Sequence, residues 1–125
     1  MARAGRLVFS LCLLGLLSSS SQVASAELIT EGQGKKKRLV ASQFGPEWAA
    51  SFKLFSVRCT KCHAMARPVN ALVSGITPVT GSPFERQEIQ RYVVKMMRKP
   101  KSGVNRDDAK QILRFLWYAR ELAKQ

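Results

Sequence analysis

The chain has 125 residues, with 21 lysines and arginines against 8 acidic residues and a formal net charge of +13. This length limits it to one domain, and three cysteines are too few for a disulfide-based scaffold. A surface this basic favours an anionic partner.

Residues 1–26 have the layout of a secretory signal peptide. Arg3 and Arg6 form a positive start, an apolar stretch follows over 7–17, and small residues ending at Ala26 form a typical cleavage site. The apolar stretch is shorter than the roughly 20 residues that cross a bilayer. We therefore expect cleavage near Ala26 and export to the periplasm. Export argues against nucleic acid, so the expected partner is an acidic protein or an anionic membrane surface.

Residues 27–45 are predicted to form a flexible, basic N-terminal arm. Gly32 and Gly34 favour flexibility, and the adjacent block from Lys35 to Arg38 carries four like charges that repel one another. We expect this arm to be solvated, and its charge could also act in electrostatic docking.

The first predicted helix runs from Pro46 to about Arg58. Proline suits a first helical turn, and three aromatic residues recur at helical spacing, Trp48, Phe52 and Phe55. The stretch 64–81 contains two prolines and two glycines and shows no helical period, which predicts a loop.

A second helix is predicted from Ser82 to about Lys99. Its first residues, Ser82 to Glu85, have the pattern of a capping box, in which serine and glutamate satisfy the first backbone N–H groups. The helix ends at Lys99 because the residue before Pro100 is pushed out of the helical region. Apolar residues recur on one side, namely Ile89, Val93, Met96 and Met97.

A third helix is predicted from Asn105 to about Lys124. Asn105 is a suitable N-cap, and Asp107 and Asp108 match the positive end of the helix. The chain shows no strand pattern and no internal repeat. We therefore predict a small all-α domain over residues 46–125.

The segment Cys59-Thr60-Lys61-Cys62-His63 is a C-x-x-C-H motif, the pattern of covalent c-type haem attachment. The two thiols add across the haem vinyl groups, and the histidine is then the proximal iron ligand. Beyond the predicted signal peptide, the motif contains every cysteine and the sole histidine of the chain. A thioredoxin-like redox pair would need a βαβ pattern, and zinc would need a fourth ligand. We therefore expect one covalent haem c.

The sixth iron ligand decides what such a haem can do. A methionine suits electron transfer, whereas an open position suits gas binding. Met65 is too close to His63 to reach the opposite haem face. Met96 lies at the centre of the apolar stripe of the second helix, and Met97 is displaced by about 100° around it. Met96 is therefore the predicted distal ligand and Met97 the second choice.

The chain resembles the class I, monohaem c-type cytochromes of bacteria from Trp48 to about Arg120. The Met-x-x-Lys-Pro sequence is shared with a smaller group of these cytochromes. The matching segments are Arg58–His63, Arg67–Asn70, Tyr92–Val104 and Ala109–Leu116.

The resemblance implies a small, cytochrome c-like helical wrap around one haem, with the first and last helices crossing through aromatic and small residues. It also implies that the Pro68 carbonyl accepts the imidazole proton of His63 and that Arg67 contacts a haem propionate. One departure is the stretch from His63 to Met96, which is shorter than in the best-known members.

The predicted function is electron transfer rather than enzymatic catalysis, with iron cycling between its ferrous and ferric states. Lys61, Lys95 and Lys99 could surround the exposed haem edge and attract an acidic redox partner. Two alternatives stay open: a haem-based gas sensor with a displaceable sixth ligand, and a haem relay subunit of a larger oxidoreductase. The chain is expected to be a monomer or a small subunit.

Overall fold

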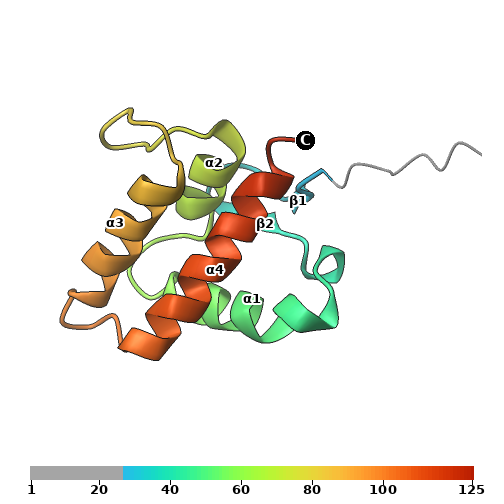
Figure 1. Ribbon diagram of the computed structural model, residues 1–125. Helices are drawn as coiled ribbons and strands as arrows, with labels where there is room; N and C mark the ends of the chain where they lie inside the picture. Colours follow the sequence, from blue (N-terminus) through green and yellow to red (C-terminus); the bar gives the residue numbers. More distant parts are fainter. Residues whose placement is uncertain (1–26) are drawn as a thin grey trace, which may run out of the picture.

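The computed structural model describes residues 27–125, so the predicted signal peptide lies outside the described residues (Figure 1). This part of the chain is mostly helical, as predicted, and it contains no helix long and apolar enough to cross a membrane. Its elements are β1 (Thr30–Glu31), the 3-10 turn η1 (Gly34–Lys36), β2 (Arg38–Leu39), the 3-10 turn η2 (Ala41–Gln43), α1 (Pro46–Arg58), α2 (Ala66–Ser74), α3 (Arg86–Met97) and α4 (Arg106–Leu122).

The segment 27–45, predicted to be a flexible arm, is folded against the helices. Strands β1 and β2 pair antiparallel, with Thr30 opposite Leu39, and we call residues 28–40 the N-terminal hairpin. Leu28, Leu39 and Phe44 are buried in the hydrophobic core. These apolar residues flank the basic block on both sides. Their burial fixes the segment despite the repulsion between its cations, which the sequence prediction overestimated.

The side chain of Gln43 completes the hydrogen bonding of the N-terminal hairpin. Its Oε1 accepts a bond of 2.8 Å from the backbone N–H of Ile29, and its Nε2 donates to the Ile29 carbonyl at 2.7 Å. The same amide nitrogen donates to the carbonyl of Val40 at 2.7 Å. The amide thus bridges Ile29 and Val40 at the open end of the hairpin, where the backbone N–H of Val40 also donates to the Ile29 carbonyl at 3.2 Å.

Helix α1 has the bounds that the sequence predicted, and its aromatic face packs on Phe115 of α4. The ring centroids of Phe52 and Phe55 lie 5.7 and 5.3 Å from that of Phe115, which confirms the predicted contact. Phe44 approaches the same ring edge-on at 5.0 Å. Because Phe55 and Phe115 are fully buried, this crossing of α1 and α4 is a central part of the core.

The stretch 64–81, predicted to be a loop, contains the nine-residue helix α2. Pro68 lies in its first turn, where a backbone N–H has no partner within the helix to lose. Gly75 ends it in the left-handed region, with φ of 69°. Pro68 and Gly75 therefore mark the ends of a short helix, and Pro78 and Gly81 belong to the connection that follows it. The inward face of α2 is made by Ala66, Val69, Ala71 and Leu72.

Helix α3 begins at Arg86, so the capping box predicted at Ser82 is not formed. Glu85 occupies the N-cap position without a side-chain cap bond, because its carboxylate binds Arg120 of α4 and Lys124 just after that helix instead. By contrast, the predicted cap of α4 is confirmed. The Oδ1 of Asn105 accepts a bond of 2.8 Å from the backbone N–H of Asp108.

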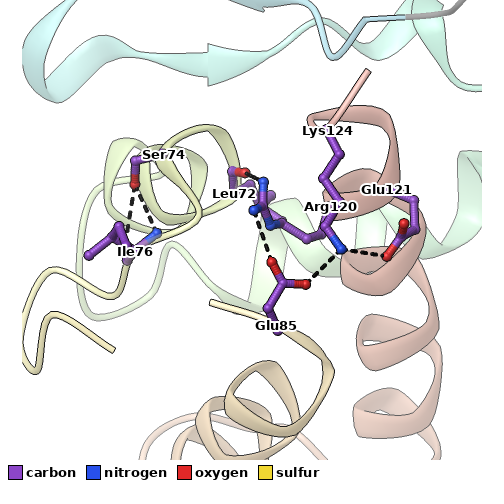
Figure 2. A network of polar contacts seen from close by, with 7 residues as sticks. All are labelled: Leu72, Ser74, Ile76, Glu85, Arg120, Glu121 and Lys124. Carbon is purple, nitrogen blue, oxygen red and sulfur yellow. Dashed lines mark hydrogen bonds and ion pairs between the residues drawn. The ribbon is translucent and has the colours of Figure 1, made fainter. Parts of the chain in front are cut away.

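A network of polar contacts centred on Arg120 joins α2, α3 and α4 (Figure 2). Its Nη1 donates to the carbonyl of Leu72 at 3.1 Å, and its Nη2 donates to Oε1 of Glu85 at 3.0 Å. Lys124 binds the other oxygen of Glu85 at 2.7 Å and also contacts Glu121 at 3.0 Å. Helix α4 therefore holds both ends of the connection between α2 and α3.

Substitution of Gly75 tests the place of Arg120 in this network. At a φ of +69°, alanine would be strained, and its Cβ would also collide with the guanidinium of Arg120. Gly81 has a similar φ of +67° but open space around it. We expect Gly81→Ala to lower the free energy of unfolding by about 1 kcal/mol and Gly75→Ala by about 2 kcal/mol or more, measured in urea. If the two variants lost equal free energy of unfolding, the guanidinium of Arg120 would not be tightly held next to Gly75.

Glu85 makes the stability of this network depend on pH. Its hydrogen bond with Lys124, and then its contacts with Arg120, hold the pKa of the carboxyl below its ordinary value of 4.5. A carboxyl whose pKa is lowered by folding stabilises the folded protein at pH values above its ordinary pKa. This contribution is lost as the pH falls through the pKa that the carboxyl has in the folded protein. We expect the stability difference between the native chain and Glu85→Gln to be constant down to about pH 5 and then to shrink. Urea unfolding across this range measures it, and a difference that grows in acid would be inconsistent with the ion pairs.

Candidate functional site

A cavity of about 460 Å³ is lined by residues of all four helices and of the loops between them. Its volume lies within the range of small-molecule and cofactor sites. Most of its wall is apolar. The wall includes Phe55 of α1, Ala71 of α2, Tyr92 and Val93 of α3, and Ile112 and Leu116 of α4.

The C-x-x-C-H motif forms one side of this cavity. Helix α1 ends at Arg58, and Cys59 follows as its C-cap, with its N–H bonded to the carbonyl of Phe55 at 2.9 Å. Cys59, Cys62 and His63 all line the cavity. The two cysteines are free thiols, with Cys62 exposed and Cys59 partly buried. The end of α1 thus brings the three predicted attachment residues to one place.

Among the three methionines of the described chain, Met96 alone lines this cavity. Met65 and Met97 pack against the hydrophobic core instead. Because successive residues of a helix point about 100° apart, neighbours in α3 face different surroundings. The structure therefore brings Met96, but not Met97, to the cavity that His63 lines.

Arg67 and Pro68 line the same cavity from α2. The resemblance to c-type cytochromes implies a hydrogen bond from the imidazole of His63 to the carbonyl of Pro68. In the structure, Nδ1 of His63 lies 3.2 Å from the carbonyl of Ala64. That acceptor belongs to the next residue along the chain. The bond from His63 to the Pro68 carbonyl, which the resemblance implies for the form with haem, stays a prediction.

Every charged group in the cavity wall is cationic: Arg58, Arg67, Lys95 and Lys99. No carboxylate of residues 27–125 lines it. Arg58 pairs with Asp108 of α4 at 3.2 Å, but its Nε–H is buried and has no acceptor among the described residues. Leaving a buried donor unsatisfied costs about 1–3 kcal/mol. The cavity therefore suits an apolar ligand with acidic substituents, one of which could accept this bond.

Burial raises the pKa of the Cys59 thiol to about 12. This thiol therefore stays protonated at neutral pH. A redox-active C-x-x-C pair works through a thiolate with a lowered pKa, so the environment of Cys59 does not favour dithiol–disulfide chemistry.

Sequence reasoning missed some of the residues that line the cavity. Arg58 lies one helical turn after Phe55, and Tyr92 lies four residues before Met96, so helical spacing could have placed both on the cavity side. Pro78 and Val79 also line the cavity, from the connection between α2 and α3. No periodic signal marks them, because their position depends on how that connection folds back.

Comparison of the chain with models of known protein families, with curated proteins and with solved structures finds no match in any of the three. The functional conclusion therefore depends on the chemistry of the cavity, since a fold by itself does not imply an activity.

The raised pKa of Cys59 predicts unequal reactivity of the two thiols. In folded protein with both thiols unmodified, we expect iodoacetamide at about pH 8 to alkylate exposed Cys62 much faster than Cys59, because only the thiolate reacts. Peptide mass spectrometry over a time course measures both rates, and Cys59→Ser and Cys62→Ser variants assign them. Similar rates for the two thiols in the folded protein would show that Cys59 is not shielded.

Proposed function

We propose that this chain is an electron-transfer protein that carries one haem c, attached covalently to Cys59 and Cys62, with His63 and Met96 as axial ligands. The observation that carries the proposal is the shared cavity. The C-x-x-C-H motif from the end of α1 and the Met96 side chain from α3 line the same apolar space. Two covalent attachment points and two axial ligands are the set that a low-spin c-type haem requires.

The charges of the cavity wall also fit haem. A haem has an apolar ring and two propionates, and the wall is apolar apart from His63, Ser102 and a small set of cations. Arg58 and Arg67 are the residues that would hold the propionates. Arg58 has a buried Nε–H without an acceptor, which a propionate oxygen could satisfy.

When bound, haem supplies a reversible one-electron couple between Fe(II) and Fe(III). The residues of this chain would set the conditions for that couple. His63 and Met96 would hold the iron in one geometry in both oxidation states. The apolar side chains Phe55, Ile112 and Leu116 would exclude water from the cavity and so limit reorganisation of solvent.

The methionine favours electron transfer over the alternative of a gas sensor. A sensor needs an open or easily displaced sixth position, whereas Met96 already lines the cavity. The helical wrap of class I bacterial cytochromes is the fold that we propose for the complex with haem. The enclosure of the cavity by all four helices supports it.

Lysines near the cavity provide a surface for an acidic redox partner in the periplasm. Lys95 and Lys99 line the cavity, and Lys61 lies within the attachment motif. Among residues 27–125, no carboxylate lies within ion-pair distance of these three lysines. Their charge therefore remains available to attract a partner, in an encounter that is fast and sensitive to salt.

An absorption spectrum of the exported protein tests the haem directly. We expect a c-type spectrum whose haem stays with the polypeptide after denaturation and acid–acetone extraction, because thioether bonds hold it. The double variant Cys59→Ser, Cys62→Ser should lose this covalent haem. Protein that is exported and folded without any haem would refute the proposal.

The methionine ligand is tested by two neighbouring substitutions. We expect Met96→Ala to lose the methionine-to-iron absorption band, to bind carbon monoxide rapidly when reduced, and to shift its reduction potential downwards. Met97→Ala is the matched control. It should keep the band, because Met97 packs against the core instead of lining the cavity. The opposite pattern would assign the ligand to Met97, and rapid carbon monoxide binding by the native protein would favour a gas sensor.

A further inference from the structure

The basic block of the chain forms the turn of the N-terminal hairpin. Lys35 and Lys36 belong to the 3-10 turn η1, and Lys37 follows as its C-cap. The first two are exposed, and Lys37 is half-buried. Consecutive residues of a 3-10 helix point about 120° apart, so the three lysines spread around the turn instead of forming one row.

This turn is held in a defined shape. Gly32 has a φ of +76°, and a Cβ at this position would collide with the backbone carbonyl of Lys36. The guanidinium of Arg38 binds the carboxylate of Glu31 at 2.7 Å across the strand pair. Together with the burial of Leu39 in the core, these contacts fix the backbone that carries the lysines. Less conformational entropy is therefore lost when the turn binds a partner.

The charges of the turn are not neutralised within the protein. Among the described residues, no acidic side chain lies within ion-pair distance of Lys35, Lys36 or Lys37. The nearby Glu31 is already paired with Arg38. These three adjacent lysines, two of them exposed and Lys37 half-buried, therefore have no acidic partner among the described residues.

An exposed apolar side chain of the hairpin favours a lipid surface as the partner. Ile29 lies at the open end of the same hairpin and leaves 54% of its surface exposed. An exposed apolar side chain on an element that also carries a polybasic turn can enter the lipid headgroup region.

We propose that the turn of the N-terminal hairpin, through Lys35, Lys36 and Lys37, binds the surface of a membrane that contains anionic phospholipids. The attraction of a lysine to such a surface is electrostatic and adds up over neighbouring cations. This site lies on a different element from the lysines near the cavity, and it does not require haem.

Vesicle binding of the exported protein tests this inference. Mass spectrometry first identifies the N-terminal residue of the exported protein, so that the chain used in the binding measurement is defined. Binding is then measured by co-sedimentation with vesicles of phosphatidylcholine alone and with vesicles of phosphatidylcholine and phosphatidylglycerol in equal amounts. We expect binding to the second kind only. The triple variant Lys35→Gln, Lys36→Gln, Lys37→Gln should lower the partition coefficient by roughly 100-fold, from the contribution of each lysine near an anionic surface.

The matched control removes three other exposed cations, in the variant Lys53→Gln, Arg106→Gln, Arg114→Gln. These residues form no ion pair in the described structure and lie on α1 and α4. Binding by this control should change only a few-fold. Equal losses in the two triple variants would overturn the proposal, because net charge alone would explain them. Binding to phosphatidylcholine alone would also overturn it.

A competition experiment separates lipid from an acidic protein. Polyglutamate should displace the native protein from anionic vesicles only at high concentration. If polyglutamate binds in a manner that depends on Lys35, Lys36 and Lys37 while vesicles do not bind at all, the hairpin is a protein-docking site and the lipid proposal is wrong. The absorption spectrum of the hairpin variant should match that of the native protein, which keeps this test independent of haem binding.

Discussion

The packing of Phe115 against α1 is the contact on which the cavity depends. Phe115 is fully buried and meets the rings of Phe44, Phe52 and Phe55. Its neighbours on α4, Ile112 and Leu116, line the cavity. The same crossing therefore fixes the direction of α1, which ends at the attachment motif, and supplies part of the cavity wall. Removing a buried phenylalanine typically costs about 3–5 kcal/mol, a large share of the 5–15 kcal/mol that stabilises an ordinary small domain.

Arg120 provides a second constraint, on the relative positions of α2 and α3. Its bonds to Leu72 and Glu85 hold the end of α2 next to the beginning of α3. The cavity-lining residues Pro68 and Met96 belong to these two helices. Because both contacts come from one largely buried guanidinium on α4, the last helix constrains α2 and the beginning of α3, as it constrains α1 through Phe115.

Local patterns in the sequence were enough to predict α1, the cap of α4 and the inward direction of Met96, because each depends on residues within a few turns of a helix. The prediction failed where distant residues decide the outcome. The capping box predicted at Ser82 does not form, because Glu85 binds Arg120 and Lys124 instead. The basic arm became a hairpin because Leu28 and Leu39 reach the core. Charge repulsion and glycine content are local signals, and neither reports such tertiary contacts.

The positive surface of the protein reflects which charges are paired as well as how many there are. Of the 8 acidic residues of the chain, 6 form ion pairs, and these pairs join β1 to β2, α1 to α4 and α3 to α4 or lie within single helices. The acidic residues thus neutralise cations that hold the fold together. The lysines without such partners include those around the cavity and those of the N-terminal hairpin. These two groups of lysines are the places for which we propose anionic partners, and salt should weaken both interactions while leaving the buried packing of Phe115 unchanged.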